Sequence, residues 1–359
     1  MVVRFLFYVA EEVRQILASM GARSLEEIIG RPDLLEQVPV PDHPKAATVD
    51  LSRVLRRVDP EGHRPRYCVQ PGGRQAVDPP LDDELMPLVR PALEGKGPVV
   101  PERGIRNVHR AVGARIAGEI AYRYGDVGLP EGSIELRFRG SAGQSFGAFC
   151  IEGMRLVLVG EANDYVCKGM HGGEVVVRPP ENAAFLPHES VIMGNTVLYG
   201  ATGGRLFAAG KAGERFAVRN SGAWTVVEGA GDHCCEYMTG GVVVVLGPTG
   251  RNFGAGMSGG MAYALDQDGQ LQRRVNPEMV GVGPVDDPDD VENLRSLVQR
   301  HHQLTESPMA GEVLARWDEY LPRFKKVAPL PHVAPPLPRE QQRARRDALL
   351  AASRTQAGG

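Results

Sequence analysis

The chain of 359 residues lacks the features that mark several classes of protein. No apolar run approaches the roughly 18 to 20 residues that span a bilayer, which argues against a transmembrane protein. A net charge of −3 supplies no overall positive field for phosphate backbones, so no nucleic-acid partner is expected. Glu11 and Glu12 directly follow the short apolar start, so no signal peptide is predicted and we expect a cytoplasmic protein without a membrane partner.

Cysteine is scarce, scattered and odd in number, which disfavours a disulfide framework. No Cys-x-x-Cys pair occurs, whereas a structural zinc site or an iron–sulfur cluster needs several thiolates or imidazoles at short spacings. We therefore expect buried, reduced thiols in a reducing compartment. The five are Cys68, Cys150, Cys167, Cys234 and Cys235.

Glycine and proline divide the chain into zones. Of the 44 glycines, 25 lie between Gly140 and Gly260, whereas the flanks are rich in proline. We expect the following zones: a helical segment at 1–38, a proline-rich extended connector at 39–102, a glycine-rich β-structure at 103–280, helices at 281–328, and a proline-rich, charged tail at 329–359.

The glycine-rich zone is an internal repeat. Gly203, Gly222, Gly240 and Gly259 recur at nearly equal intervals, and a β-prone run follows each of them. Such a short period suits one coil of a parallel β-helix, with glycine at corners where φ is positive or the next coil is close. A β-sandwich would give turn signals without this self-similarity. We therefore predict a mainly β fold, a single-stranded parallel β-helix with short flanking helices.

The N-terminal flank carries helix signals. Apolar residues at helical spacing predict a helix from the start of the chain to Met20, and Gly21 stands where its C-terminal cap would lie. Ser24 and Glu27 then form a capping box, which predicts the start of a second, short helix.

Turn and helix signals also follow the repeat. The pair Asp268-Gly269 predicts a hairpin between two β-prone runs. Beyond Asp286, apolar residues at helical spacing predict two helices. A proline-rich run that starts at Ala328 then predicts a polyproline linker.

Two short motifs of known chemistry overlap around Gly256. Gly254-x-Gly256-x-x-Gly259 matches the dinucleotide-binding pattern, which works only where a helix follows and offers its N-terminus to the pyrophosphate. Ser258 lies in a Gly-x-Ser-x-Gly pattern, but a nucleophile elbow also needs a strand-to-helix turn. Because a β-prone run follows both, we expect a β-helix corner and a turn hydroxyl.

The cluster Asp232-His233-Cys234-Cys235 is the most suggestive of catalysis, because a neighbouring imidazole can lower the pKa of a thiol. Neighbours on a strand point to opposite faces, however, so His233 should not face Cys234. Cys235 also occupies a repeated position, which indicates a small core residue. We expect no catalytic residue here.

Two further patterns resemble metal sites. His301 and His302 have no third ligand at a metal-binding spacing, so we interpret them as part of a solvated helix face. Asp266 and Asp268 begin like a calcium loop, but no bidentate glutamate follows, so a turn is expected.

Longer motifs in the repeat resemble the C-terminal glycine-rich domain of the glutamate synthase large subunit. They lie at 140–149, 162–173, 213–223, 231–241 and 247–260, and one of them reads Gly231-Asp-His-Cys-Cys-Glu-Tyr-Met-Thr-Gly-Gly. The likeness extends to 103–110, 275–280 and 317–327, and residues 7–14 are similar to the last helices of the family's FMN-binding synthase domain. It covers most of residues 4–327.

This resemblance implies a right-handed parallel β-helix with a structural, interdomain role. In the family, an amidotransferase domain hydrolyses glutamine, and a separate barrel domain with FMN and an iron–sulfur cluster reduces 2-iminoglutarate. The resemblance therefore implies no catalytic, cofactor-binding or metal-binding residue in this chain. The implied partners are glutamine amidotransferase and FMN-binding synthase domains, with an NADPH-dependent small subunit as a further candidate.

Three functions stay open from the sequence. The leading hypothesis is a noncatalytic subunit or domain of a glutamate synthase-type enzyme, organising amidotransferase and FMN units for the reductive conversion of glutamine and 2-oxoglutarate to two glutamates. The alternative is a free-standing β-helix scaffold in a related complex of the N-methylglutamate synthase or formylmethanofuran dehydrogenase type. An independent small-molecule enzyme is the third, and it rests only on the short motifs.

Overall fold

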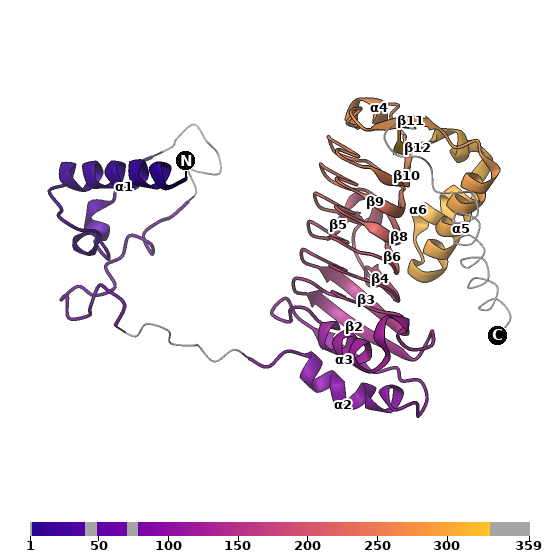
Figure 1. Ribbon diagram of the computed structural model, residues 1–359, viewed down its shortest axis with the longest axis horizontal. Helices are drawn as coiled ribbons and strands as arrows, with labels where there is room; N and C mark the ends of the chain where they lie inside the picture. Colours follow the sequence, from indigo (N-terminus) through magenta and orange to yellow (C-terminus); the bar gives the residue numbers. More distant parts are fainter. Residues whose placement is uncertain (1, 40–48, 70–77, 331–359) are drawn as a thin grey trace. The chain divides into compact units, whose positions relative to one another are not determined.

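A computed structural model describes residues 2–39, 49–69 and 78–330 of the chain (Figure 1). It contains two compact units, Met1–Asp78 and Pro79–Gly359, which are taken in turn. Among the described residues, no helix combines the length and the apolar character needed to cross a bilayer.

The N-terminal unit is built around one exposed helix. α1 (Val2–Ser19) is followed by Gly21 with φ +74°, the left-handed conformation expected after a helix end, and only Leu17 of the helix is buried. The second helix is shorter than predicted. Ser24 makes no side-chain capping bond, and a single 3-10 turn, η1 (Leu25–Glu27), forms in place of an α-helix.

The segment predicted to be an extended connector, 39–102, contains a helix that belongs to the second unit. α2 (Asp82–Leu93) buries one apolar face although Pro87 and Pro91 lie inside it. Proline normally disrupts a helix because it lacks an N–H group and clashes with the preceding turn, so the sequence pattern obscured this element.

The next helix is capped by a residue of α2. α3 (Ala114–Tyr124) begins where Asp82 accepts hydrogen bonds from the backbone N–H groups of Gly113, at 2.8 Å, and Arg115, at 2.9 Å. Burial raises the pKa of the Asp82 carboxyl, while these backbone donors oppose the shift. The cap therefore fixes α2 and α3 against each other at the start of the β-structure.

The main body of the second unit is a parallel β-solenoid, as predicted. Within the described residues, seven strands stack in the order β2-β3-β4-β6-β8-β9-β10, and β1 pairs with β2 (Figure 1). A shorter second row contains β5 and β7. The strands are β1 (Glu102–Ile105), β2 (Ile134–Ala142), β3 (Met154–Ala162), β4 (Glu174–Arg178), β5 (Val191–Met193), β6 (Arg205–Ala208), β7 (Lys211–Ala212), β8 (Ser221–Val227), β9 (Thr239–Val245) and β10 (Gly259–Leu265).

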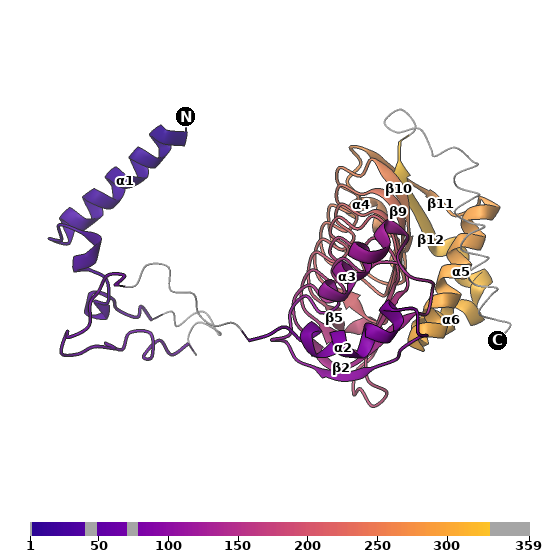
Figure 2. The same cartoon turned by 60° about the horizontal axis from the view of Figure 1, so that its bottom comes forward.

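Side chains alternate along these strands between an inner and an outer core. Leu156 and Leu158 point into the solenoid and belong to its inner cluster, whereas Phe207 and Val226 belong to a separate cluster outside it. Two helices, α5 (Pro288–Thr305) and α6 (Pro308–Ala315), contribute to the outer cluster and cover the later coils (Figure 2). Both helices follow Asp286, as predicted.

The hairpin predicted at Asp268-Gly269 does not form. The Asp266 carboxylate accepts from the N–H of Leu271, at 3.1 Å, and the short helix α4 (Leu271–Arg274) follows. β10 instead pairs antiparallel with β12 (Phe324–Pro329), which lies beyond the helices in sequence.

The last strand also replaces the start of the predicted polyproline linker, because Ala328 pairs with Gly281 of the neighbouring strand. Residues from 331 onward lie outside the described part of the chain. The remaining elements are η2 (Pro32–Leu34), η4 (Gly125–Val127), η5 (Pro187–Glu189), β11 (Val280–Pro284), α7 (Trp317–Tyr320) and η6 (Leu321–Arg323).

Candidate functional site

One corner of the solenoid has an unusual backbone. In six successive coils, three alternate residues all have φ between +53° and +71°, a region that residues other than glycine rarely adopt. These triplets are Ser145, Gly147, Phe149; Tyr165, Cys167, Gly169; Thr196, Leu198, Gly200; Arg215, Ala217, Arg219; His233, Cys235, Tyr237; and Asn252, Gly254, Gly256. Hydrogen bonds between coils offset the strain.

The backbone at one triplet illustrates these bonds. The N–H of His233 donates to the carbonyl oxygen of Arg251 on the following coil, at 2.7 Å. The N–H of Cys235 donates to Phe216 on the preceding coil, at 2.8 Å. Alternate residues therefore bond in opposite directions, which ties each corner to both of its neighbours.

The apparent dinucleotide motif belongs to this corner. Gly254 and Gly256 are left-handed residues of the last triplet, and Gly259 starts β10 with its backbone packed against Thr239. Because a strand follows, no helix N-terminus faces a ligand. Ser258 precedes the same strand and its N–H bonds to a backbone carbonyl, so the nucleophile-elbow geometry is absent from this described segment.

The adjacent cysteines occupy core positions. Cys235 is the middle residue of its triplet, and Cys234 occupies the position that Phe146, Phe216 and Phe253 hold in other coils, all of them fully buried. The two sulfur atoms lie 3.7 Å apart. Burial raises the pKa of the Cys235 thiol well above its usual value, and the neighbouring thiol adds to the shift. Cys235 is therefore a poor nucleophile in the folded protein, and Cys234 is enclosed in the core beside it.

His233 does not approach the neighbouring thiol, although the structural reason differs from the prediction. It lies in a corner turn and not on a strand, with its side chain 36% exposed and Nδ1 4.0 Å from Glu236 Oε1. Cys234 points into the core, where it is 1% exposed. The His233 imidazole therefore lies on the outside of the coil and the Cys234 thiol on the inside.

The interpretation of His301 as part of a solvated helix face is wrong. Its side chain and that of Glu228 are completely buried, and Nε2 lies 3.2 Å from Glu228 Oε1. The Ser307 hydroxyl donates to the same carboxylate oxygen, and His302 Nδ1 lies 3.0 Å from the Ser307 carbonyl oxygen. The carboxylate lies between the other two groups and no substrate can reach it. The cluster anchors α5 and α6 to the solenoid.

Metal-ligand geometry is absent from the residues that the structure describes, where no group of three His, Cys, Asp or Glu side chains could hold an ion. At the sequence that resembles a calcium loop, Asp268 pairs with Arg274, and this hydrogen-bonded pair lowers the pKa of the Asp268 carboxyl. The chain therefore turns at Asp266 and Asp268, as expected, and this turn leads into α4.

A ladder of opposite charges crosses the outer face of the first coils. Glu135, Arg155, Glu174 and Arg205 are register partners on four successive strands. Glu174 is almost buried, and Arg155 Nε and Arg300 Nη2 lie 3.2 and 3.1 Å from its carboxylate oxygens. Cross-strand pairs of opposite charge stabilise register, and Arg300 brings α5 into the same network.

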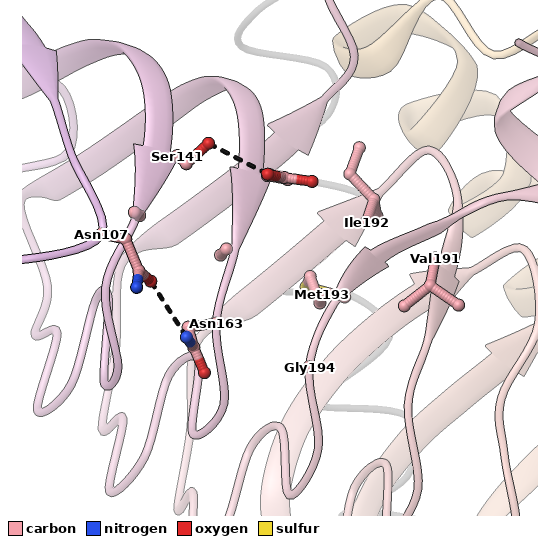
Figure 3. A pocket seen from close by; sticks show the side chains of 10 residues that line it. Asn107, Ser141, Asn163, Val191, Ile192, Met193 and Gly194 are labelled. Atoms are coloured by element: carbon pink, nitrogen blue, oxygen red, sulfur yellow. Dashed lines mark hydrogen bonds between the residues drawn. The ribbon is translucent and has the colours of Figure 1, made fainter. Parts of the chain in front are cut away.

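A pocket of about 410 Å³ opens where the repeat is interrupted (Figure 3). The step from Gly172 to Gly203 is far longer than the step from Gly203 to Gly222, which is typical of the later coils. The extra chain, 179–190, runs between β4 and β5. The pocket is lined by Asn107, Ser141, Ala142, Glu161, Ala162, Asn163, Val191, Ile192, Met193 and Gly194.

Two polar pairs face an apolar wall in this pocket. The Ser141 hydroxyl donates to Glu161 Oε1 at 3.0 Å, and Asn163 Nδ2 donates to Asn107 Oδ1 at 2.9 Å. Figure 3 shows the side chains of β5 on the opposite side. No sequence motif indicated these residues, and the only available signal was the length of the interrupted coil.

The chain has known relatives. The family model described as the GXGXG motif matches residues 82–330. Ferredoxin-dependent glutamate synthase 2 of Synechocystis is 48% identical over 330 residues, which cover 91% of this chain and 21% of that protein.

Two further relatives show the same pattern. Ferredoxin-dependent glutamate synthase 1 of Arabidopsis thaliana is 50% identical over 332 residues, 91% of this chain and 20% of that protein. The glutamate synthase [NADPH] large chain of Bacillus subtilis is 43% identical over 331 residues, 91% of this chain and 21% of that protein. The chain thus spans about a fifth of the length of these relatives.

Proposed function

Because the chain belongs to the GXGXG family and matches part of glutamate synthase large subunits, we propose that it is a noncatalytic structural part of a glutamate synthase-type enzyme. In this proposal it holds an amidotransferase part and an FMN-binding part in register, so that ammonia released from glutamine meets 2-oxoglutarate at the flavin. FMN and the iron–sulfur cluster belong to those other parts, and an NADPH-dependent small subunit is a further candidate partner.

The observation that carries this proposal is the continuous stack of the solenoid. Seven parallel strands at about 4.8 Å per step make a body roughly 30 Å long. Its interior is closely packed, and hydrogen bonds join each corner to the next. A body of this kind resists bending and compression, as a spacer between two catalytic parts must.

The exposed helix α1 supports the existence of a further contact. Phe5, Phe7 and Tyr8 are 65%, 71% and 73% exposed, and Val2 and Val3 are similarly open. The first half of α1 is apolar apart from Arg4, and an exposed apolar surface of this kind normally marks a contact with another protein surface. We propose that this helix packs into the FMN-binding part, in line with the resemblance of residues 7–14 to its last helices.

The positions of the reactive side chains support a noncatalytic role. Cys234 and Cys235 are packed in the core, and His301 anchors a helix to the solenoid. His233 lies outside, away from any thiol. Each group that suggested chemistry in the sequence therefore has a packing or surface role in the proposal.

Native co-purification tests this function. The tagged chain is isolated from its own cells, and the eluate is assayed for flavin, for glutaminase and for glutamate formation that needs both glutamine and 2-oxoglutarate. The proposal expects all three in the complex and no flavin in the isolated chain. Stoichiometric flavin in the isolated chain would contradict it. Co-purification with subunits of an N-methylglutamate synthase or formylmethanofuran dehydrogenase would favour the alternative scaffold, and the cytoplasmic location stays a prediction.

A further inference from the structure

We propose that the pocket at the interrupted coil binds a primary ammonium group carried on a short aliphatic chain. This inference concerns the pocket of Figure 3 alone and holds whether or not the chain is part of a glutamate synthase. It follows from the charge and the polarity of the lining residues.

Glu161 supplies the charge. It is the only ionisable side chain among the lining residues, and the Ser141 hydroxyl donates to one of its oxygens at 3.0 Å. No cationic side chain from the described parts of the chain lies within ion-pairing distance of this carboxylate. Glu161 is exposed, so its carboxylate is hydrated, but it is oriented by Ser141 and forms no ion pair with a described residue; a cation with hydrogen-bond donors is its complement.

The opposite wall supplies an apolar surface. Val191 is 60% exposed and supplies most of this surface, whereas Ile192 and Met193 belong to the inner core and are only 4% and 1% exposed. Figure 3 places these β5 residues across from Ser141 and Asn163. A chain of about four carbons can lie along this wall while its charged end reaches Glu161, as lysine side chains do at protein surfaces.

The same lining excludes other ligand classes. None of the lining residues is a lysine, arginine or histidine, so a phosphate, a dicarboxylate or a nucleotide would place its negative charge beside Glu161 without a counterion. A free amino acid would leave its own carboxylate unpaired. The reactants of a glutamate synthase therefore do not fit this pocket.

The test is a titration of the full chain with n-butylammonium, followed by the amide chemical shifts of Ser141, Glu161 and Val191. We expect a dissociation constant on the order of millimolar, as befits a ligand of about five heavy atoms. Methylammonium, which cannot reach the apolar wall, should bind more weakly. Glu161→Gln should weaken binding at least tenfold, whereas Glu214→Gln, outside the pocket, should leave it unchanged.

A second probe separates two sources of the ammonium group. Nα-acetyl-lysine methylamide carries the same group on a peptide backbone, so binding as tight as that of n-butylammonium identifies a lysine of a partner protein as the occupant. Binding of n-butylammonium alone identifies a free amine. Equal binding by Glu161→Gln with an unchanged amide spectrum, or tighter binding of 2-oxoglutarate, would overturn the proposal, as would the absence of shifts in the wild-type pocket.

Discussion

Replacing Gly240 with alanine should destabilise the solenoid more than replacing Gly200 or Gly283 with alanine. The backbone of Gly240 lies against that of Ser221 on the preceding coil, and its φ is not left-handed. An added Cβ would lie 2.9 Å from the Ser221 carbonyl carbon and closer still to its oxygen, whereas ordinary contact starts at 3.4 Å. The glycine is therefore required for close approach and not for a positive φ.

The free-energy cost of Gly240→Ala depends on which atoms must move to make room for the added methyl group. The obstacle is backbone, so the two coils have to separate, and the bond from the Thr239 N–H to the Asn220 carbonyl oxygen, 2.9 Å long, is stretched. Overpacking and one weakened hydrogen bond together cost about 2 to 4 kcal/mol. That loss of unfolding free energy corresponds to a fall in Tm of about 4 to 8 °C for a unit of this size.

Two control variants separate clash from backbone strain. Gly200 has φ +66° with open space around it, so Gly200→Ala adds strain alone and should cost about 1 kcal/mol. Gly283 is neither left-handed nor crowded, so Gly283→Ala should change stability by less than about 0.5 kcal/mol. Urea unfolding followed by tryptophan fluorescence measures all three, since Trp224 and Trp317 both lie in the second unit.

The order of the three losses in stability shows whether close approach or a positive φ is the stronger requirement for glycine. Gly240→Ala should be the most damaging, Gly200→Ala intermediate and Gly283→Ala neutral. If Gly240→Ala were as stable as Gly283→Ala, the coils would not be packed as closely as described. If Gly200→Ala were the most damaging, the backbone strain of a positive φ would cost more free energy than the steric clash between coils.

Four further predictions concern thiols, capping and catalysis. In the native protein at pH 8 one thiol, the exposed Cys68, should react with a thiol reagent, and rapid reaction of more would contradict the described burial. Burial raises the pKa of Cys150 from an ordinary 9.0 to about 12, so its stabilising contribution is present below pH 9 and is lost as pH rises toward 12, which urea titration can follow. Asp82→Ala should lower the free energy of unfolding by about 1 kcal/mol and Asp82→Asn by less, because asparagine can still cap α3, and equal effects would refute the cap. His233→Ala and Cys234→Ala should leave glutamate formation by the assembled enzyme within a few fold of wild type, and a loss of several orders of magnitude with the fold intact would reveal a catalytic role.

The solenoid was predictable because its signal is local and repeated. Gly203, Gly222, Gly240 and Gly259 are equivalent in the structure: a Cβ at each would strike a backbone carbonyl of the preceding coil. The nearly constant interval between these glycines thus reports the length of one coil. The left-handed triplets left a weaker trace, because most of their members are not glycine.

Contacts between distant segments could not be predicted in this way. His301 and Glu228 are far apart in the sequence, and neither residue belongs to a periodic pattern that shows its partner. α2 was concealed by its two internal prolines. The pocket joins Asn107, Ser141 and Val191 from three separate segments, and only the length of the interrupted coil marked its place.

The central claim, that this chain organises two catalytic parts without performing chemistry, is tested most directly by the stoichiometry of the coupled reaction. Glutamine consumed and 2-oxoglutarate converted to glutamate are measured together in the native complex and in the same complex carrying Gly240→Ala in this chain. The account predicts one glutamine per 2-oxoglutarate in the native complex, and excess glutamine hydrolysis, with flavin content unchanged, when the solenoid is weakened. Tight coupling that persists after the solenoid has measurably lost stability at the assay temperature would contradict it.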